Sequence, residues 1–446
     1  MNSQSKKMEL LGSASIPKAL FSMGIPTMIG MLVNAFYNLV DAYFVGGLGE
    51  SQMGAISVVY PLGQVVVGLG LLFGNGAASY ISRLLGRGDK ENADKVASTA
   101  LYSSVSVGAV IITISMVFLH PILKLLGATD SILPFAATYA SIYIVSCIFN
   151  VFNVTMNNIV TSEGAAKTTM CALLTGAVLN IALDPLFIYV FDLGVAGAAI
   201  ATAISQVVST CVYLTCILRK KSVFHFRIKD CAYTKETMSE IFKIGIPTLV
   251  FQILTSVSIS LINNAAGDYG DSAIAGMGVV TRLISMGNLS VFGFIKGFQP
   301  IAGYSYGAKK FDRLREAIKT SILWSTVFCM IFGVILALFP TAIVSRFTKG
   351  DAGMIRIGAT SLRANGISIM LFGFYTVYSS LFLALGKGRE GFILGACRQG
   401  ICFIPVILLL PIVWGAKWNY VRPADCRCAF RNHNGIHGDT APQKTE

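Results

Sequence analysis

Charged residues are scarce in this chain. Asp, Glu, Lys and Arg make up 13% of its 446 residues, whereas an average soluble domain contains about 25%. Apolar runs long enough to cross a bilayer recur along nearly the whole length. The shortage of charge and the recurrence of these runs exclude a soluble globular protein and predict an all-α integral membrane protein.

Catalytic and cross-linking patterns are also missing. The ten cysteines are scattered, mostly within apolar runs, and show neither metal-ligand spacing nor a disulfide framework. Of the four histidines, His120 and His225 fit loop or interfacial positions better than ligand positions. Residues 1–15 are polar, so no cleaved signal is expected. Because no nucleophile–base pair emerges, we do not expect an enzyme.

The positive charge is unevenly distributed over the predicted topology. The formal net charge is +13, and 22 Lys and Arg residues fall in six segments, which are 1–18, 79–95, 161–168, 219–243, 303–319 and 386–391. The opposite loops hold four, and they are 47–52, 120–133, 191–196, 267–273 and 341–356. By the positive-inside rule, the N-terminus is predicted in the cytoplasm. A nucleic-acid partner is not expected, because the charges are divided among short segments.

The first half of the chain recurs in the second half. Residues 21–27, which read Phe-x-x-Gly-Ile-Pro-Thr, return as residues 242–248 after an offset of 221. The offset continues without a gap over more than sixty residues and places Gly86 on Gly307. Such a repeat in a hydrophobic chain is typical of membrane transporters built from two related bundles.

The apolar runs predict eleven membrane spans. They are 17–46, 53–78, 96–119, 134–160, 169–191, 196–218, 239–266, 274–302, 319–340, 357–385 and 392–414. Because six spans fall in the first repeat, the second repeat begins on the same side of the membrane. We therefore predict two parallel six-helix bundles, an N-terminal lobe over 1–218 and a C-terminal lobe over 239–415, joined by a cytoplasmic linker over 219–238.

The last helix of this plan is missing or out of frame. After Gly415 the chain stays polar through 416–446, and a disordered tail is one explanation. We favour a shifted reading frame, because the codons permitted for Lys417 and Trp418, read one base later, allow a plausible helix entry. Resequencing the gene around Gly415 tests this idea. A shifted frame with an early stop, or without an apolar span, would refute it.

Few carboxylates lie inside the predicted spans, and two of them, Asp41 and Asp184, lie far from the cytoplasmic ends. Asp41 has Tyr37 four residues before it and Asp184 has Asn180 four residues before it, so each acid shares a helical face with a polar side chain. Both fall in the outer halves of spans that run from inside to outside, which predicts a similar depth. Oxygen ligands of this kind suit Na⁺ or a titrating proton. A purely structural hydrogen bond between helices is the alternative.

The surroundings of these acids differ between the repeats. Pro185 directly follows Asp184 and is expected to bend its helix, which frees carbonyl groups toward a cavity. In the second repeat Asp41 corresponds to Ile262, and Asp184 falls near Val406. We therefore expect the ion chemistry in the first bundle only.

Four basic residues lie within predicted spans and not at their first few positions. Lys296 is toward the cytoplasmic end of its span, where snorkelling is the favoured interpretation and lining of the substrate path the alternative. Arg282, Arg363 and Arg398 are expected to pair with carbonyl groups, with the lining of a cavity as the alternative. Glu163, by contrast, is expected in a solvated loop.

Several stretches together point to one family. They are Gly-Ile-Pro-Thr-Met at 24–28, Asn-Leu-Val-Asp-Ala-Tyr-Phe-Val-Gly at 38–46, Gln-Met-Gly-Ala-Ile-Ser at 52–57, Ser-Arg-Leu-Leu-Gly at 82–86, Asn-x-x-x-Asp-Pro at 180–185 and Gln-Pro-Ile-Ala-Gly-Tyr-x-Tyr-Gly-Ala at 299–308. Over about residues 1–415 the chain resembles the multidrug and toxic compound extrusion (MATE) family, and its MepA-like branch in particular. The resemblance implies twelve helices in two lobes, a central cavity, and alternating access driven by inward H⁺ or Na⁺.

Carried over by position, the resemblance assigns cation coupling to residues of the first lobe. Asp41 and Asp184 match the family's acids, with Tyr37, Asn180 and Thr202 as co-ligands. Na⁺ is a candidate at Asp41, Asn180 and Asp184. The candidate substrate-cavity residues are Asn34, Asn38, Gln252, Lys296, Gln299, Arg363 and Arg398.

We therefore predict a secondary active multidrug efflux antiporter of the bacterial inner membrane. It is expected to act as a monomer in the lipid bilayer on drug-like organic cations, with no cofactor besides the coupling H⁺ or Na⁺. A flippase for lipid-linked or oligosaccharide substrates is the nearest alternative, and it would line its cavity with basic residues such as Lys296, Arg363 and Arg398. A non-transporting receptor fits less well, since no segment is long enough for a soluble signalling domain.

Overall fold

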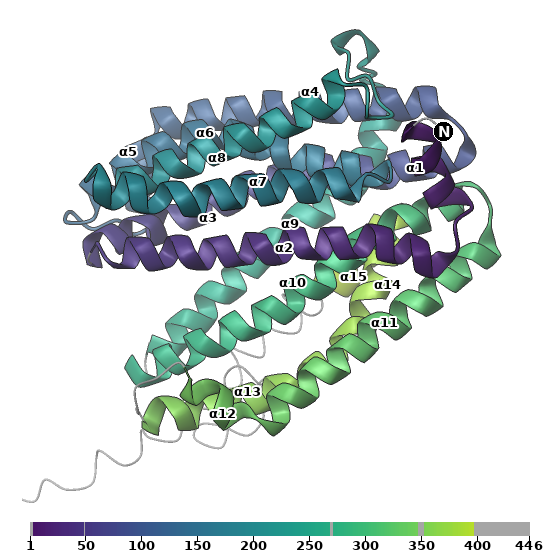
Figure 1. Cartoon of the computed structure of the whole chain (residues 1–446). Coiled ribbons are helices and arrows are strands. Elements are labelled where there is room, and N and C mark those ends of the chain that lie inside the picture. Colours follow the sequence, from purple (N-terminus) through teal and green to yellow (C-terminus); the bar gives the residue numbers. More distant parts are fainter. Residues whose placement is uncertain (1–2, 49, 268–270, 347–351, 397–446) are drawn as a thin grey trace, which may run out of the picture. The chain divides into compact units, whose positions relative to one another are not determined.

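The computed structural model describes residues 3–48, 50–267, 271–346 and 352–396, most of which are helical (Figure 1). The long helices of the first repeat are α2 (Ile16–Gly46), α3 (Glu50–Arg87), α4 (Lys90–Val117), α6 (Leu133–Ser162), α7 (Ala166–Pro185) and α8 (Gly194–Leu218). Those of the second repeat are α9 (Lys235–Gly267), α10 (Asp271–Gly307), α11 (Phe311–Leu338), α13 (Ala352–Ile369) and α14 (Phe372–Ala384). The short elements are α1 (Ser3–Gly12), α5 (Leu119–Leu125), the π-helix η1 (Leu186–Val190), the 3₁₀ helix η2 (Ile228–Asp230), α12 (Pro340–Ser345) and α15 (Gly388–Ala396).

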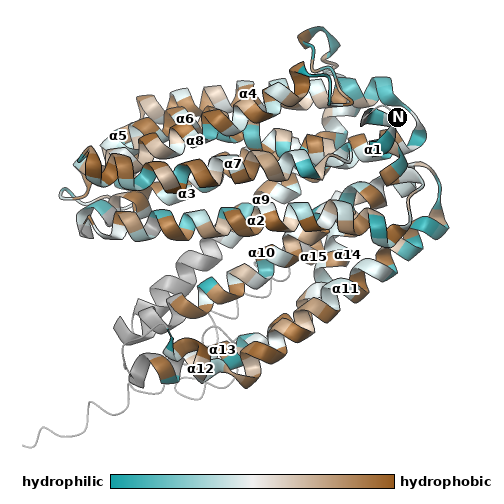
Figure 2. Cartoon of the chain, viewed as in Figure 1, coloured by the Kyte–Doolittle hydropathy of each residue, from teal (hydrophilic) through white to brown (hydrophobic). Residues whose placement is uncertain are grey.

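The prediction of an all-α integral membrane protein is confirmed. Among the described residues, nine helices are long and apolar enough to cross a membrane, and a bent pair brings the number to ten. Figure 2 shows hydrophobic residues along the lengths of α4, α7 and α11. The span predicted at 357–385 corresponds to this bent pair, in which Gly358–Ile369 and Phe372–Ala384 meet at an angle of 50°. Only the start of the span predicted at 392–414 is described, and the tail 416–446 lies outside the described residues.

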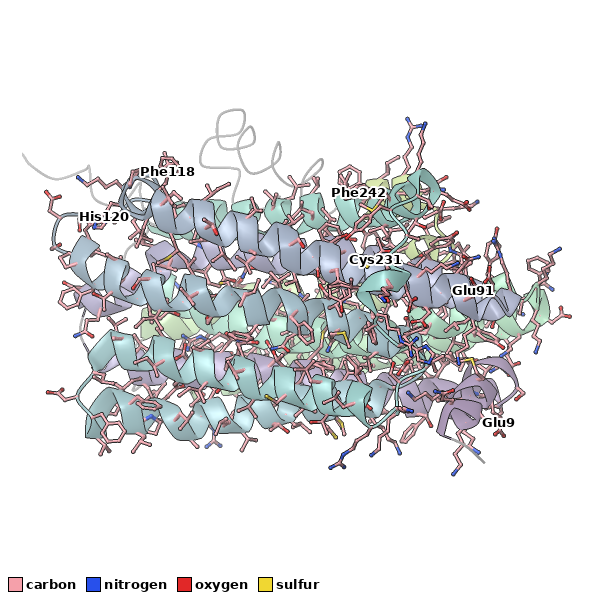
Figure 3. All side chains as sticks on the ribbon, turned by 90° about the horizontal axis from the view of Figure 1, so that it is seen from above. Glu9, Glu91, Phe118, His120, Cys231 and Phe242 are labelled. Carbon is pink, nitrogen blue, oxygen red and sulfur yellow. The ribbon has the colours of Figure 1, made fainter. Side chains whose placement is uncertain are left out.

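The chain forms two compact units. The first contains Met1–Ile253, Leu289–Leu323 and Thr376–Gly395, and the second contains Leu254–Asn288 and Trp324–Tyr375. Both units therefore contain parts of helices α9, α10, α11 and α14 of the second repeat. In the first unit, Glu9 and Glu91 lie at one end of the helices, and Phe118 and His120 lie at the other (Figure 3).

Within the first unit, α3 and α10 make a reciprocal contact. The carbonyl oxygen of Tyr304 lies so close to Gly86 that no Cβ atom fits, and the carbonyl oxygen of Arg83 lies against Gly307 in the same way. The offset of 221 relates Gly86 to Gly307 and Arg83 to Tyr304, so each contact is the equivalent of the other. A self-complementary contact of this kind implies a two-fold relation between the two helices.

A further contact joins two equivalent residues of α3 and α10. Ser82 lies against Gly303, where an added Cβ would approach the Ser82 Cβ to 2.8 Å, and these two positions are themselves equivalent. This contact therefore lies at the two-fold axis between α3 and α10, and it agrees with the prediction of two related copies.

The repeated Gly-Ile-Pro motif lies where helices of the two repeats touch. Gly245 of α9 packs against the carbonyl group of Leu72, and Gly24 of α2 packs against Phe294. Nearby, the hydroxyl of Thr27 donates to the carbonyl oxygen of Gly293 at 2.6 Å. Glycine is needed at both motif positions because the facing helix leaves no room for a side chain.

The linker and the N-terminal helix are fastened to the first lobe by a buried acid. Glu163 is fully buried, which shows that the predicted solvated loop is wrong. Its carboxylate accepts from Lys7 Nζ at 2.6 Å, from Ser222 Oγ at 2.8 Å and from the backbone N of Val223 at 2.6 Å. Apolar linker side chains at 223, 224 and 226 complete the attachment by entering the lobe's core.

Removal of Lys7 is expected to destabilise this attachment strongly. Lys7→Ala leaves the buried Glu163 carboxylate without its counter-charge, a change that typically costs about 3–5 kcal/mol. We expect a lower melting temperature of the purified protein and faster proteolysis within α1. Lys95→Ala, which breaks an exposed pair with Glu91, is the matched control and should leave both readouts nearly unchanged. Equal effects of the two variants would show that the buried pair contributes no more stability than the exposed pair.

Candidate cation site and substrate path

The two predicted acids lie on helices that pack against each other, α2 and α7. Asp41 is in the last turns of α2, and Asp184 is the penultimate residue of α7. Asp184 is fully buried and Asp41 is half-buried. The two carboxyl groups are near enough to act on each other electrostatically. The structure thus brings the pair together within the first repeat.

Three oxygen atoms of this site lack hydrogen-bond donors. Asn180 donates from Nδ2 to Asp184 Oδ1 at 3.2 Å. The buried oxygens Asp41 Oδ1, Asn180 Oδ1 and Asp184 Oδ2 accept no hydrogen bond from the described residues. Leaving a buried acceptor unsatisfied costs about 1–3 kcal/mol. A hard cation coordinated by these oxygens, or a proton on a carboxyl group, would remove that cost.

Tyrosines surround the acids. Tyr37, one turn before Asp41, interacts electrostatically with both carboxyl groups. From α6, Tyr139 interacts in the same way with Asp41, and its ring stacks on that of Tyr143 with centroids 5.5 Å apart. Sequence analysis missed these two tyrosines. The signal that was available is their spacing of four, which places both on one helical face.

The chain beside Asp184 departs from regular helix, as its proline predicts. Pro185 ends α7, and the π-helix η1 follows it. Gly197 of α8 packs so closely on η1 that an added Cβ would approach the carbonyl oxygen of Phe187 to 2.6 Å. Such π-helical turns widen the backbone spacing and are frequent at functional sites.

The other predicted residues of the first lobe are less closely joined to the acids. Thr202 lies half-buried in α8, and among the described residues no hydrogen bond links it to Asp184. Asn34 and Asn38 are exposed on α2, where Asn38 Nδ2 donates to the carbonyl oxygen of Asn34 at 2.7 Å. These three assignments remain predictions.

The predicted cavity residues of the second repeat are dispersed. Gln252 of α9 donates to Gln64 of α3 at 2.6 Å, whereas Lys296 and Gln299 of α10 line a small cavity. Arg363 is exposed in the second unit. Arg398 and Val406 lie outside the described residues, as does the side chain of Ile262.

Lys296 does not snorkel to the end of its helix, contrary to expectation. Its Nζ atom donates to Oδ1 of Asn157 on α6 and is partly buried. The ammonium group is therefore directed toward the other repeat, and the interpretation of Lys296 as an interfacial residue is wrong.

The fold and the site define a multi-pass membrane transporter built from two parallel repeats. The MatE family model matches residues 26–186 and 247–409, and the two matched ranges begin 221 residues apart, which is the repeat offset. The chain therefore belongs to the MatE family, as the sequence motifs predicted, and is a transporter, not an enzyme.

Similar proteins extend this result over nearly the whole chain. The multidrug export protein MepA of Staphylococcus saprophyticus is 32% identical over 403 residues, which cover 90% of this chain and 89% of the relative. A crystal structure of MATE in complex with MaD3S is 26% identical, covers 95% of both chains and has a TM-score of 0.87. A multidrug resistance MATE family transporter of the MOP superfamily in the outward-facing conformation is 27% identical, with 95% coverage of both chains and a TM-score of 0.86.

Proposed function

We propose that this transporter is a secondary active antiporter that exports amphipathic organic cations in exchange for inward H⁺ or Na⁺. The observation that carries the proposal is the trio of buried oxygens on Asp41, Asn180 and Asp184 that accept no hydrogen bond from the described residues. They belong to the repeat in which sequence analysis expected the ion chemistry, and a relative at 32% identity is a multidrug export protein.

The coupling ion and the organic cation compete for one negatively charged site. The carboxyl pair attracts a coupling ion, and the same charge attracts an organic cation. Tyr37 lies one turn before Asp41 on the same helix and would offer its aromatic ring to such a cation. Each ligand shifts the conformational equilibrium only by its difference in affinity for the two states. Coupling therefore requires that ion and drug prefer opposite conformations.

The orientation in the membrane is part of the same proposal. The excess of Lys and Arg in the segments that include α1 and the linker supports a cytoplasmic location for that end of the helices. Export then means release at the end marked by Phe118 and His120 (Figure 3). We further propose that the protein works in the inner membrane as a monomer, because each lobe is supplied by the same chain.

Transport by purified protein tests the proposal. In proteoliposomes, an imposed Na⁺ or pH gradient should drive a fluorescent organic cation against its own gradient, and collapse of the effective gradient with an ionophore should stop it. The ion whose gradient alone drives this uphill transport is the coupling ion. Uphill transport that persists without any ion gradient would contradict antiport.

A further inference from the structure

A small polar cavity lies within the first unit, apart from the carboxyl pair. It is lined by Asn75, Ala78, Ser79 and Ser82 of α3, Asn158 and Thr161 of α6, Lys296, Gln299 and Pro300 of α10, and Leu383 and Ala384 at the end of α14. The free space at its centre is about that of one water molecule. The cavity therefore suits a single small group and not a whole drug molecule.

The cavity lies between equivalent parts of the two repeats. The offset of 221 relates Asn75 to Lys296 and Ala78 to Gln299, and all four residues line it. The lining is thus nearly symmetric in position but not in charge. Where the first repeat contributes a carboxamide, the second contributes an ammonium group.

Among the described residues that line the cavity, Lys296 alone is charged. Its Nζ atom donates to the neutral carboxamide oxygen of Asn157, and no described carboxylate lies within ion-pair distance of it. An ammonium group inside a membrane protein without a counter-charge costs free energy. A small anion in the cavity would supply the missing charge.

Two carboxamides of the lining keep hydrogen-bond donors for a ligand, whereas the hydroxyl groups of the lining do not. The hydroxyl groups of Ser79, Ser82 and Thr161 already donate to backbone carbonyl oxygens. Asn75 uses one amide proton on Thr248 and keeps a second, and among the described residues Gln299 makes no recorded hydrogen bond. A lysine and two carboxamides of the lining therefore keep protons that an acceptor in the cavity could use.

The cavity is too far from Asp41 for one drug molecule to touch both. Gly297, next to Lys296, packs against Gly24 of α2, and Asp41 is 17 residues further along that helix. At 1.5 Å per residue the separation along α2 is about 25 Å. A ligand in the cavity therefore acts independently of the carboxyl pair.

We propose that the Lys296 cavity is an anion site, which takes either the carboxylate of an exported compound or a free small anion such as chloride. The proposal rests on the function proposed above and extends it. Because the two sites are too far apart to be filled by one molecule at once, a zwitterionic compound would occupy the anion site before or after the carboxyl pair, and the transporter would thereby accept zwitterionic compounds as well as simple cations. A purely cationic compound gains nothing from the site.

A matched pair of dyes tests the site. A rhodamine with a free benzoate and its methyl ester share one cationic ring system and differ only in the carboxylate. We expect wild-type protein in proteoliposomes to export both. Lys296→Gln should reduce export of the acid relative to the ester by about tenfold or more, the range for loss of a charge-assisted hydrogen bond. Lys296→Arg, which keeps the charge, should retain export of the acid.

Controls separate this effect from loss of folding or of transport. Lys18→Gln removes a lysine that is exposed on α2 and should leave the ratio of acid to ester unchanged. Ester export by Lys296→Gln reports that the variant is folded. If Lys296→Gln loses export of both dyes equally, or of neither, the site does not bind the carboxylate of the substrate. The anion site is then overturned unless export depends on chloride in the experiment below. Failure of wild-type protein to export either dye would overturn the antiporter itself.

Exchange of chloride for gluconate distinguishes the two sources of the anion. If a free anion occupies the cavity, ester export by wild-type protein falls when chloride is replaced, and Lys296→Gln is insensitive to the replacement. If the carboxylate of the substrate occupies it, chloride has no effect and the acid-to-ester ratio changes as above. If export depends neither on chloride nor on the carboxylate of the dye, the proposal is refuted.

Discussion

Asp41→Asn is expected to reduce drug resistance in a sensitive host to the level of the empty vector, while the protein still inserts into the membrane. The substitution keeps the size of the side chain but removes the negative charge that attracts both the ion and the drug. Growth in the presence of an exported cation measures the effect, and immunodetection in isolated membranes measures insertion. Asp184→Asn should have the same effect, because the two carboxyl groups act on one another.

A third aspartate gives a matched control for this prediction. Asp192 is exposed in the turn after η1, and its backbone has a φ of 53° that asparagine accommodates well. Asp192→Asn makes the same chemical change outside the site and should leave resistance at the wild-type level. Undiminished resistance in Asp41→Asn would refute the assignment of the carboxyl pair.

Gly86→Ala and Gly307→Ala are each expected to impair folding or transport severely. In either variant the new methyl group collides with a backbone carbonyl of the facing helix, that of Tyr304 or of Arg83. Backbone cannot rotate away as a side chain can, so α3 and α10 must separate. Overpacking of this kind costs about 1–3 kcal/mol, and more where the backbone must move. Melting temperature and export activity measure the effect.

The symmetry of the contact makes this prediction stricter. Because the two glycines occupy equivalent contacts, their variants should lose similar amounts of stability. Gly46→Ala is the control, since an added Cβ there meets nothing within 4 Å. A large effect at one glycine and none at the other would show that the α3–α10 contact is not reciprocal in solution.

Periodic and repeated features of this protein could be predicted from the sequence. Apolar runs alone located the spans, because crossing a bilayer demands a long run of apolar residues. The offset of 221 located equivalent positions such as Gly86 and Gly307, and these proved to make equivalent contacts. Asp41 and Asp184 could be singled out because a carboxylate within a span is costly and therefore rare.

Partners from distant parts of the chain could not be predicted. Glu163 reads as a loop residue because its sequence neighbours are polar, and only folding brings Lys7 and the linker around it. Lys296 reads as a snorkelling residue because its own helix ends nearby, whereas Asn157 lies 139 positions away in sequence. Tyr139 was missed for a related reason: its spacing of four from Tyr143 marks one helical face, but only the tertiary structure places that face near the acids.

The dependence of drug affinity on ion concentration tests the central claim most directly. Affinity of the purified protein for an exported cation can be measured over a series of Na⁺ concentrations and pH values. Because coupling between two ligands is reciprocal, wild-type affinity should fall as the coupling ion rises. In the Asp41→Asn, Asp184→Asn double variant the affinity should be weaker and independent of both ions. A double variant that keeps the wild-type ion dependence would contradict the assignment of coupling to this pair.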